Sequence, residues 1–332
     1  MILDVELVNA QPTYDHWNIL IKAQNSQIND SLANFGIRPD ATSDFDNAYD
    51  IPRPPRAPSG NYLEVYFPHS GSNFPPLLGS KYAVDFQGPI DPTWNFSVEA
   101  SLAGPISLTW DMSYLNSIEE RLQLFLLDLT NGNLIDMRAN EIYTFSYTAK
   151  RDFQIIGAVN VGFKYIMEGF WNGTAQVRDT VSGYLAQSVF PFSFIDSSQY
   201  YLSSSGTGRF IFKNAVSGNY YFVIRHRNHI EIWTSISLDI VKGTTSFTEY
   251  DFTNHADAAF GSGALKPIGA VYAAWGGDVN QDGVIDYLDR NITWNNRGIN
   301  GRLSSDCNGD NNTDATDLDI VLNNRYKTIQ KP

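Results

Sequence analysis

Short apolar runs separated by turn-forming residues recur along the chain as far as residue 272. Residues 1–8 alternate between apolar and polar side chains, which predicts a half-buried strand, and residues 17–23 predict a second strand. The prolines of residues 51–60 argue against a central strand there, because proline cannot donate a hydrogen bond to a sheet ladder. We interpret 51–60 as a surface loop, since residues 1–50 alone hold too few strands for a core; an interdomain linker is the alternative.

From residue 62 onwards, short strands are predicted at regular intervals. Asn131-Gly132-Asn133 is a tight hairpin signal, and Arg227-Asn228-His229 also fits a turn between paired strands. This spacing is typical of antiparallel sandwiches. The sequence therefore predicts a mainly β fold with two antiparallel β-sandwich (Ig-like) domains, over 1–161 and 162–272. The strands predicted in them are 62–67, 94–100, 106–110, 122–129, 143–147, 153–161, 163–171, 174–184, 208–212, 220–227, 230–235 and 248–252.

The pattern changes after residue 274, where Asp and Asn recur within two 12-residue segments, 278–289 and 306–317. A calcium ion takes about 6–8 oxygen ligands, and a 12-residue loop supplies them from positions 1, 3, 5, 7, 9 and 12, the seventh through its backbone carbonyl. Position 6 needs a left-handed backbone, which Gly283 provides and Asn311 tolerates. The predicted ligands of two calcium ions are Asp278, Asn280, Asp282, the Val284 carbonyl, Asp286 and Asp289, and Asp306, Asn308, Asp310, the Asn312 carbonyl, Asp314 and Asp317.

The repeat continues beyond the loops, because the same shift aligns residues 295–297 with 323–325 and predicts a short helix after each loop. A duplicated loop–helix unit that ends in Asp, with no room for a helix before the first loop, resembles the type I dockerin module over 274–332. The resemblance implies a small helical module that binds two calcium ions and docks onto a cohesin-like domain. Dockerins read cohesins largely through loop positions 10 and 11, often Ser-Thr. Here these positions are Tyr287-Leu288 and Ala315-Thr316, a departure from that pattern.

Charge predicts that this module depends on its metal. Residues 274–332 contain nine Asp, no Glu and six Lys or Arg, a net charge of −3 that two calcium ions would change to +1. So small a module buries too little apolar surface to hold unpaired carboxylates together, and we expect calcium binding to be coupled to folding. The alternative, a disordered acidic linker, does not explain the matched loops. The helices carry more apolar surface than they can cover between them, which predicts contact with another domain; these residues are Tyr287, Leu288, Ile292, Trp294, Leu318, Ile320, Val321 and Leu322.

Composition limits the classes of partner. The 332 residues are 42% hydrophobic and 14% aromatic, which suits several β-rich domains. A net charge of −13 without clustered Lys and Arg argues against nucleic acid, and no run approaches the ~20 apolar residues of a membrane span. The single Cys307 gives no disulfide framework. The chain begins without signal-peptide features, and we expect an extracellular or cell-surface protein whose targeting segment has been removed.

No catalytic constellation is recognisable. His226 and His229 flank the predicted turn and are interpreted as surface residues rather than metal ligands. Glu119 and Glu120 are adjacent, so their side chains diverge and do not form a glycosidase pair. Four tryptophans are expected in the sandwich cores rather than on a sugar-binding platform: Trp94, Trp110, Trp171 and Trp233. Five Asn-X-Ser/Thr sequons leave glycosylation open: Asn29, Asn95, Asn172, Asn291 and Asn311.

Three classes of function remain. The first is a secreted, non-catalytic structural or assembly protein, such as a fibre or surface-matrix subunit, whose calcium module docks onto identical subunits or a cohesin-like domain. In that class, strand 1–8 adds to a sheet edge of a neighbouring copy, or alternatively pairs within its own subunit. The second is a dockerin-bearing component of a polysaccharide-degrading complex, with a possible polysaccharide ligand. The third is an enzyme with an unrecognised site.

Overall fold

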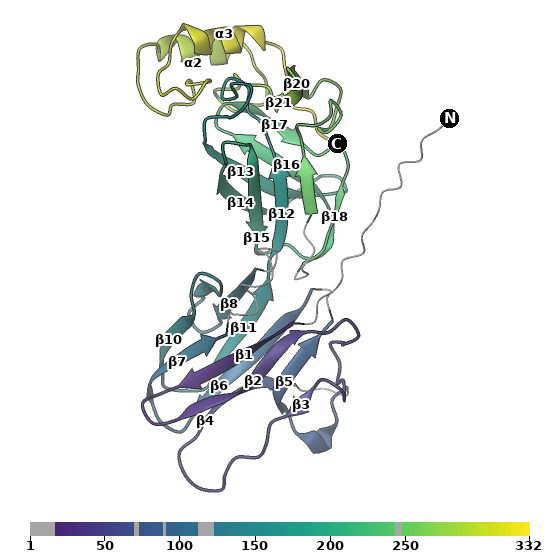
Figure 1. Cartoon of the computed structure of the whole chain (residues 1–332), viewed down its shortest axis with the longest axis vertical. Helices are drawn as coiled ribbons and strands as arrows, with labels where there is room; N and C mark the ends of the chain where they lie inside the picture. The colour runs from purple at the N-terminus through teal and green to yellow at the C-terminus, as the bar shows by residue number, and fades with distance from the viewer. Residues whose placement is uncertain (1–16, 70–72, 89–90, 112–122, 243–247) are drawn as a thin grey trace, which may run out of the picture. The chain divides into compact units, whose positions relative to one another are not determined.

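The computed structural model describes residues 17–69, 73–88, 91–111, 123–242 and 248–332. The chain divides into two compact units. Unit 1 comprises Met1–Ala158 with Val241–Ser246, and unit 2 comprises Val159–Ile240 with Phe247–Pro332. The described residues are mainly in β-strands, with α2 (Tyr287–Asn295) and α3 (Ala315–Asn323) near the C-terminal end (Figure 1). The prediction of a mainly β, sandwich-like fold is confirmed.

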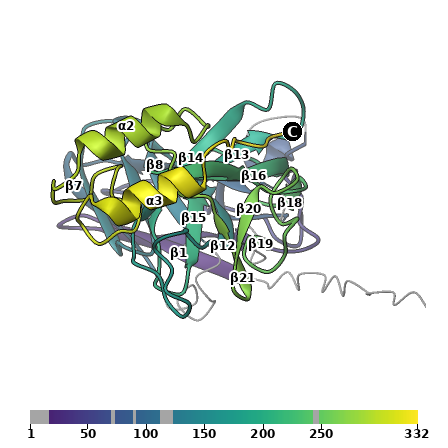
Figure 2. The same cartoon turned by 90° about the horizontal axis from the view of Figure 1, so that it is seen from above.

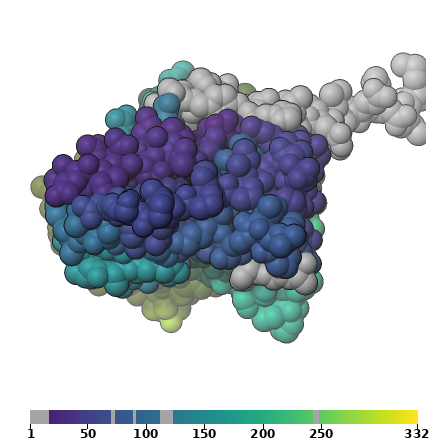
Figure 3. Space-filling view, turned by 90° about the horizontal axis from the view of Figure 1, so that it is seen from below, coloured from purple at the N-terminus to yellow at the C-terminus, as the bar shows by residue number. Residues whose placement is uncertain are grey.

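Unit 1 is built on one long, curved sheet. Its strand order is β10-β7-β1-β2-β5-β4-β6-β11-β8-β9, with β3 paired to β5. The neighbours are antiparallel except β2 and β5, which run parallel. In Figure 3 the purple surface of the first strands continues into the blue surface of the segments that follow them. The elements are β1 (Trp17–Gln24), β2 (Asn29–Ile37), β3 (Ile51–Pro52), β4 (Leu63–Pro68), η1 (Pro76–Leu78), β5 (Lys81–Gln87), β6 (Thr93–Ala100), β7 (Gly104–Trp110), β8 (Leu124–Asp128), β9 (Leu134–Asp136), β10 (Ile142–Tyr147) and β11 (Arg151–Gly157).

Aromatic side chains form the core of unit 1. Trp17 on β1 and Trp94 on β6 are buried, and their ring centroids lie 5.5 Å apart although three strands separate β1 from β6 in the sheet order. Phe145 on β10 likewise meets Phe153 on β11 at 5.2 Å. The sheet therefore folds back on itself and packs its two halves face to face, as in a sandwich.

Unit 2 contains a sandwich of two smaller sheets. One has the order β15-β12-β19, in which β12 and β19 are parallel, and the other has the order β14-β13-β16-β17, with β18 paired to β16. Phe222 of the second sheet packs against both Phe163 and Phe210 of the first, with ring centroids at 5.8 and 5.6 Å. The strands are β12 (Val159–Lys164), β13 (Thr180–Gln187), β14 (Phe194–Tyr201), β15 (Thr207–Phe212), β16 (Gly218–His226), β17 (His229–Trp233), β18 (Leu238–Ile240), β19 (Thr248–Asp251), β20 (Leu265–Ile268) and β21 (Val271–Ala274).

The helical module belongs to the same compact unit as the second sandwich. The hairpin of β20 and β21 leads into it, and α2 and α3 contact each other over the end of the sandwich (Figures 1 and 2). The unit boundary falls between Ala158 and Val159 rather than at 161/162, because β12 already pairs with β15 and β19. No boundary of compact units falls near 273.

Several predicted strands require correction. The run 153–161 is two strands, because β11 ends at Gly157 in unit 1 and β12 starts at Val159 in unit 2. Strands 163–171 and 174–184 are wrong for most of their length, since residues 165–179 make only isolated bridges outside the named strands. The predicted strand 1–8 and the pair Glu119 and Glu120 lie outside the described residues. The hairpin at Asn131-Gly132-Asn133 is confirmed, with Gly132 at φ 76° between β8 and β9.

Candidate calcium module and its anchor on the sandwich

The first acidic loop closes on its own last residue. The Oδ1 atom of Asp289 accepts hydrogen bonds from the backbone amides of Val279 (2.8 Å) and Asn280 (3.1 Å), and its Oδ2 accepts one from Asp286 (2.8 Å). Asp286 in turn caps α2 through the Leu288 amide at 2.7 Å. Asp289, the last residue of the loop, thus orders the start of the loop. Asp286, the N-cap of α2, is held by a capping box with Asp289.

The second loop repeats this pattern bond for bond. Asp317 accepts from the amides of Cys307 (2.6 Å), Asn308 (3.1 Å) and Asp314 (2.8 Å), and Asp314 caps α3 through the amide of Thr316 at 2.7 Å. The left-handed backbone expected at position 6 is confirmed in both loops. The φ values there are 89° at Gly283 and 67° at Asn311.

The oxygen atoms of the loops fit a hard cation. Asp278 is buried, and its Oδ1 atom has no hydrogen-bond partner. Burial, followed by the nearby charge of Asp289, raises the pKa of Asp278 to about 7. Burial also raises the pKa values of three other carboxyl groups, those of Asp289, Asp306 and Asp317. A bound cation would offset both effects, because it supplies a partner for Oδ1 of Asp278 and a positive charge beside the buried carboxylates.

Carboxylates alone do not complete either site. Among the described residues, no group of three or more His, Cys, Asp or Glu side chains is drawn together closely enough to hold a metal ion. Each loop would therefore have to use its Asn side chain and a backbone carbonyl as well, which is the mixed oxygen set that calcium accepts. A cavity of about 290 Å³ lined partly by Asp278, Asp282 and Gly283 lies beside the first loop.

The turn between β16 and β17 anchors both loops to the sandwich. Asn228 is fully buried there and donates from Nδ2 to the Asp306 carbonyl at 2.7 Å, while its own carbonyl accepts from the Gly277 amide at 2.8 Å. Gln281 of the first loop donates to the His226 carbonyl. One turn residue therefore bonds the segments that start the two loops, which fixes their positions on unit 2.

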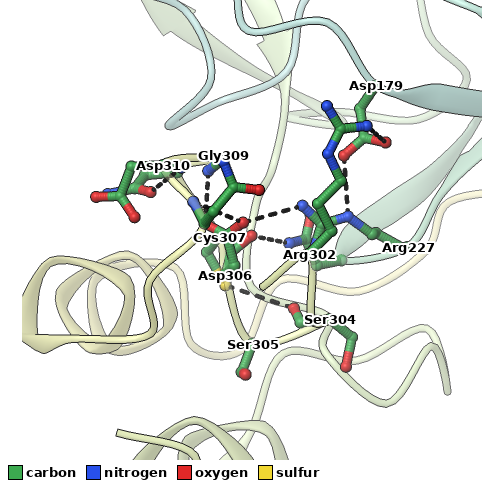
Figure 4. Close-up of polar contacts among 12 residues, drawn as sticks. Asp179, Arg227, Arg302, Ser304, Ser305, Asp306, Cys307, Gly309 and Asp310 are labelled. Carbon is green, nitrogen blue, oxygen red and sulfur yellow. Dashed lines mark hydrogen bonds and ion pairs between the residues drawn. The ribbon is translucent and has the colours of Figure 1, made fainter. Parts of the chain in front are cut away.

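Arg227 in the same turn places a positive charge against the second loop. Its guanidinium lies 3.0 Å from Asp179 and 3.4 Å from the Asp306 carboxylate, and Figure 4 shows it between these two groups. The pKa of Asp306 is raised by burial, and the charge of Arg227 opposes that rise. Position 1 therefore differs between the two loops. Asp306 in the second loop has an ion-pair partner, whereas Asp278 in the first loop has a buried oxygen without a hydrogen-bond partner.

Apolar packing reinforces the anchor. Ile230 on β17 is buried with Val279, Ile285, Cys307 and Val321 of the module. Ile292 and Ile320 pack against the same cluster. Of the eight residues predicted to contact another domain, Val321, Ile292 and Ile320 thus pack with Ile230 of the second sandwich.

Gly309 shows how closely the second loop approaches the sandwich. It has φ 75°, and a Cβ atom built there would lie 2.6 Å from Cε1 of Phe170. Both observations require glycine, because an L side chain rarely adopts this backbone and no space remains for it.

Four apolar side chains of the helices remain exposed: Tyr287, Leu288, Trp294 and Leu322. Tyr287 is 68% and Trp294 44% exposed. The guanidinium of Arg297 stacks 3.5 Å above the Trp294 ring. Tyr287 and Leu288 occupy loop positions 10 and 11, so the positions that dockerins use for recognition are at the surface here.

The interpretation of His226 and His229 as surface residues is wrong. Both are buried, and their Nδ1 atoms lie 2.9 Å apart. Nε2 of His229 lies 3.0 Å from the Glu168 carbonyl, and Nε2 of His226 lies 3.5 Å from Asp179. Burial lowers the pKa of both histidines. The expectation that tryptophans fill the cores is confirmed for Trp94, Trp110 and Trp233, whereas Trp171 is half-buried.

No protein-family model and no curated protein matches the chain. Among solved structures, it is similar to two interface mutants of a type II cohesin–X–dockerin complex from Acetivibrio cellulolyticus. These share 17% and 16% identity over 51% of this chain and 97% of the other, with TM-scores of 0.31 and 0.30. BcpA, the major pilin subunit of Bacillus cereus, is 9% identical over 57% of this chain and 69% of its own, with a TM-score of 0.17. In the described part of the chain, no helix is long and apolar enough to cross a membrane.

Proposed function

We propose that the chain is a non-catalytic, extracellular assembly protein whose C-terminal module binds two calcium ions and then docks onto a protein partner. The observation that supports calcium best is the shared hydrogen-bond pattern of two loops, together with the buried Asp278 oxygen that has no partner. Two ions would be held by the twelve residues predicted from the sequence, six in each loop, with Asn and backbone oxygens completing each site.

The chemistry that calcium supplies is charge neutralisation. Without it, Asp278 and Asp289 are buried near one another, and burial opposes ionisation of each. Since both loops are tied to the β16–β17 turn through Asn228, binding would order the loops and fix the module against the sandwich. Calcium then acts on the orientation of the helices, the part of the module that is left to meet a partner.

The exposed side chains of Tyr287, Leu288 and Trp294 support docking through α2 and the end of the first loop. Aromatic residues with an exposed ring and an adjacent arginine are common at the centre of protein interfaces. The partner is proposed to be a protein, either a second copy of this chain or a cohesin-like domain. A scaffold-attached, polysaccharide-binding component is the second candidate, supported by the same dockerin-like pattern at residues 274–332.

Calcium binding is tested by titration calorimetry of the full chain after chelation. The expected stoichiometry is two ions for the wild type and one for Asp278→Ala or Asp306→Ala. Asp319→Ala is the matched control, because Asp319 is an exposed acidic residue of α3 outside the predicted ligand set. A wild-type chain that binds no calcium, or that binds it unchanged in both loop variants, would refute the proposal.

Docking is tested by sedimentation velocity with and without calcium. Calcium-dependent oligomers that are lost in Tyr287→Ala and Trp294→Ala support a partner made of identical subunits. A monomer that captures an isolated cohesin domain in calcium, but not in chelator, supports the cohesin-like partner. A calcium-loaded monomer that binds neither copies of itself nor cohesins, and that binds polysaccharide instead, would contradict docking onto a protein.

A further inference from the structure

An amine, a carboxamide and a carboxylate meet where the module joins the sandwich. Lys266 lies on β20, Asn324 follows the last turn of α3, and Glu168 lies between β12 and β13. The Lys266 amine donates to Oε1 of Glu168 and, at 3.0 Å, to Oδ1 of Asn324. Nδ2 of Asn324 donates to Oε2 of Glu168 at 2.5 Å. Each group therefore contacts both others, although the residues lie far apart in the chain.

Neighbouring backbone atoms hold this triangle in one orientation. Nδ2 of Asn324 also donates to the Gly276 carbonyl at 2.8 Å, and the Gly276 amide donates to Oε2 of Glu168 at 3.1 Å. These bonds fix which end of the carboxamide faces the lysine, so its carbonyl points to Nζ and its amino group to the carboxylate.

The site is largely shielded from water. Asn324 is fully buried and Glu168 is 7% exposed, whereas the Lys266 side chain retains 27% exposure. The Trp275 ring lies 5.1 Å from the lysine Nζ and covers part of the remaining side. Water exclusion matters here because water would compete with the lysine amine as the nucleophile.

We propose that Lys266 and Asn324 form an intramolecular isopeptide bond, with Glu168 as the proton carrier. Glu168 takes a proton from the Lys266 ammonium, and the free amine attacks Cγ of Asn324. The tetrahedral centre loses its amino group as Glu168 passes a proton to Nδ2 and accepts the second proton of Nζ. The Nζ–Cγ bond forms, the Cγ–Nδ2 bond breaks and one ammonia leaves, so the reaction needs no oxidant or co-reactant.

The bond would join β20 to the end of α3 and lock the helices onto the rest of unit 2. The first repeat provides an internal comparison, because Asn296 occupies the equivalent helix end and donates to Ser305 at 3.0 Å. The crosslink does not require the docking function proposed above. Its product is read from mass, whereas the calcium proposal is read from binding, so the two can fail separately.

The decisive experiment is mass spectrometry of the purified full chain after incubation in calcium. The expected mass is that of the full sequence minus one ammonia, and proteolysis should give a branched peptide that joins Lys266 to Asn324. Succinimide formation at an Asn-Gly site also loses ammonia, but it gives no branched peptide. A chain with the full sequence mass, or an ammonia loss without the branched peptide, would overturn the proposal.

Variants locate the reaction. Lys266→Arg and Asn324→Ala should retain the full sequence mass, and Glu168→Gln should slow the loss of ammonia at least tenfold. Asn296→Ala and Lys327→Arg are matched controls and should react as the wild type does. Circular dichroism verifies that each variant is folded, and the wild-type branched peptide decides the matter even where a variant does not fold. A branched peptide at Asn324 in the Lys266→Arg variant would also overturn the assignment.

Discussion

Truncating Ile230 tests whether the calcium module and the second sandwich fold as one unit. Ile230 lies on β17, is 2% exposed, and packs with Val279, Ile285 and Val321 of the module. Replacing a buried isoleucine by alanine removes this contact and leaves a cavity, at a cost of about 2–5 kcal/mol. The lost packing energy belongs to the contact between the sandwich and the module, because the Ile230 side chain comes from the sandwich and its neighbours come from the module.

The magnitude can be compared with the contribution of calcium. A ligand at 100 times its dissociation constant stabilises the folded state by about 2.7 kcal/mol. Ile230→Ala should therefore remove stability comparable to the gain from one calcium ion. If ordering of the loops is coupled to packing on the sandwich, the apparent calcium affinity should fall by a factor of about 30 or more, since each 1.4 kcal/mol is tenfold.

The assay is denaturant unfolding followed by fluorescence and far-ultraviolet circular dichroism, with and without calcium. Ile19→Ala is the matched control, because Ile19 is equally buried but belongs to the core of unit 1. It should destabilise unit 1 and leave calcium affinity unchanged. The reasoning is refuted if Ile230→Ala binds calcium as the wild type does, or if module and sandwich unfold in separate calcium-dependent and calcium-independent steps.

Two further predictions concern Gly309 and the buried histidines. Gly309→Ala should destabilise unit 2 by about 1–3 kcal/mol in thermal unfolding, through backbone strain and a clash with Phe170. Gly298→Ala is the control and should cost less, because Gly298 has φ 80° but lies in open space. Equal losses of stability in the two variants would contradict the clash with Phe170. Burial lowers the pKa of His226 and His229 in the folded chain. Below a pH of about 6.5 the unfolded chain therefore binds more protons than the folded chain does, so unit 2 should lose stability as the pH falls below this value. His229→Gln should flatten this dependence in denaturant unfolding, and an unchanged slope would disprove it.

Strands were predictable where apolar residues alone line the buried face. Residues 94–100 and 106–110 were recognised as strands, and β6 and β7 occupy them. Strand β2 was missed, because its inward face includes Asp30. That carboxylate is buried only because Arg53 lies 2.9 Å away and the Val65 amide donates to it at 2.6 Å. Both partners come from distant segments, so no local pattern could indicate that Asp30 faces inward.

The acidic loops were the most predictable part of the candidate site. Their ligand spacing, the left-handed residue at position 6 and the helix after each loop all depend on residues close together in the sequence, and the structure has the left-handed residue and the helix in both repeats. Short-range hydrogen bonds set the backbone geometry of such loops, so the repeat could be recognised from the sequence without knowledge of the tertiary structure.

Only the tertiary structure decided what surrounds these loops. Asn228 meets Asp306 across 78 positions, and Lys266, Glu168 and Asn324 meet across 58 to 156 positions. His226 and His229 are likewise buried against Phe170, which lies more than 50 positions earlier in the chain. A sequence determines the chemistry that each of these side chains can perform, but their distances depend on how β-strands pair over long separations. That pairing is fixed by the packing of the whole core rather than by neighbouring residues.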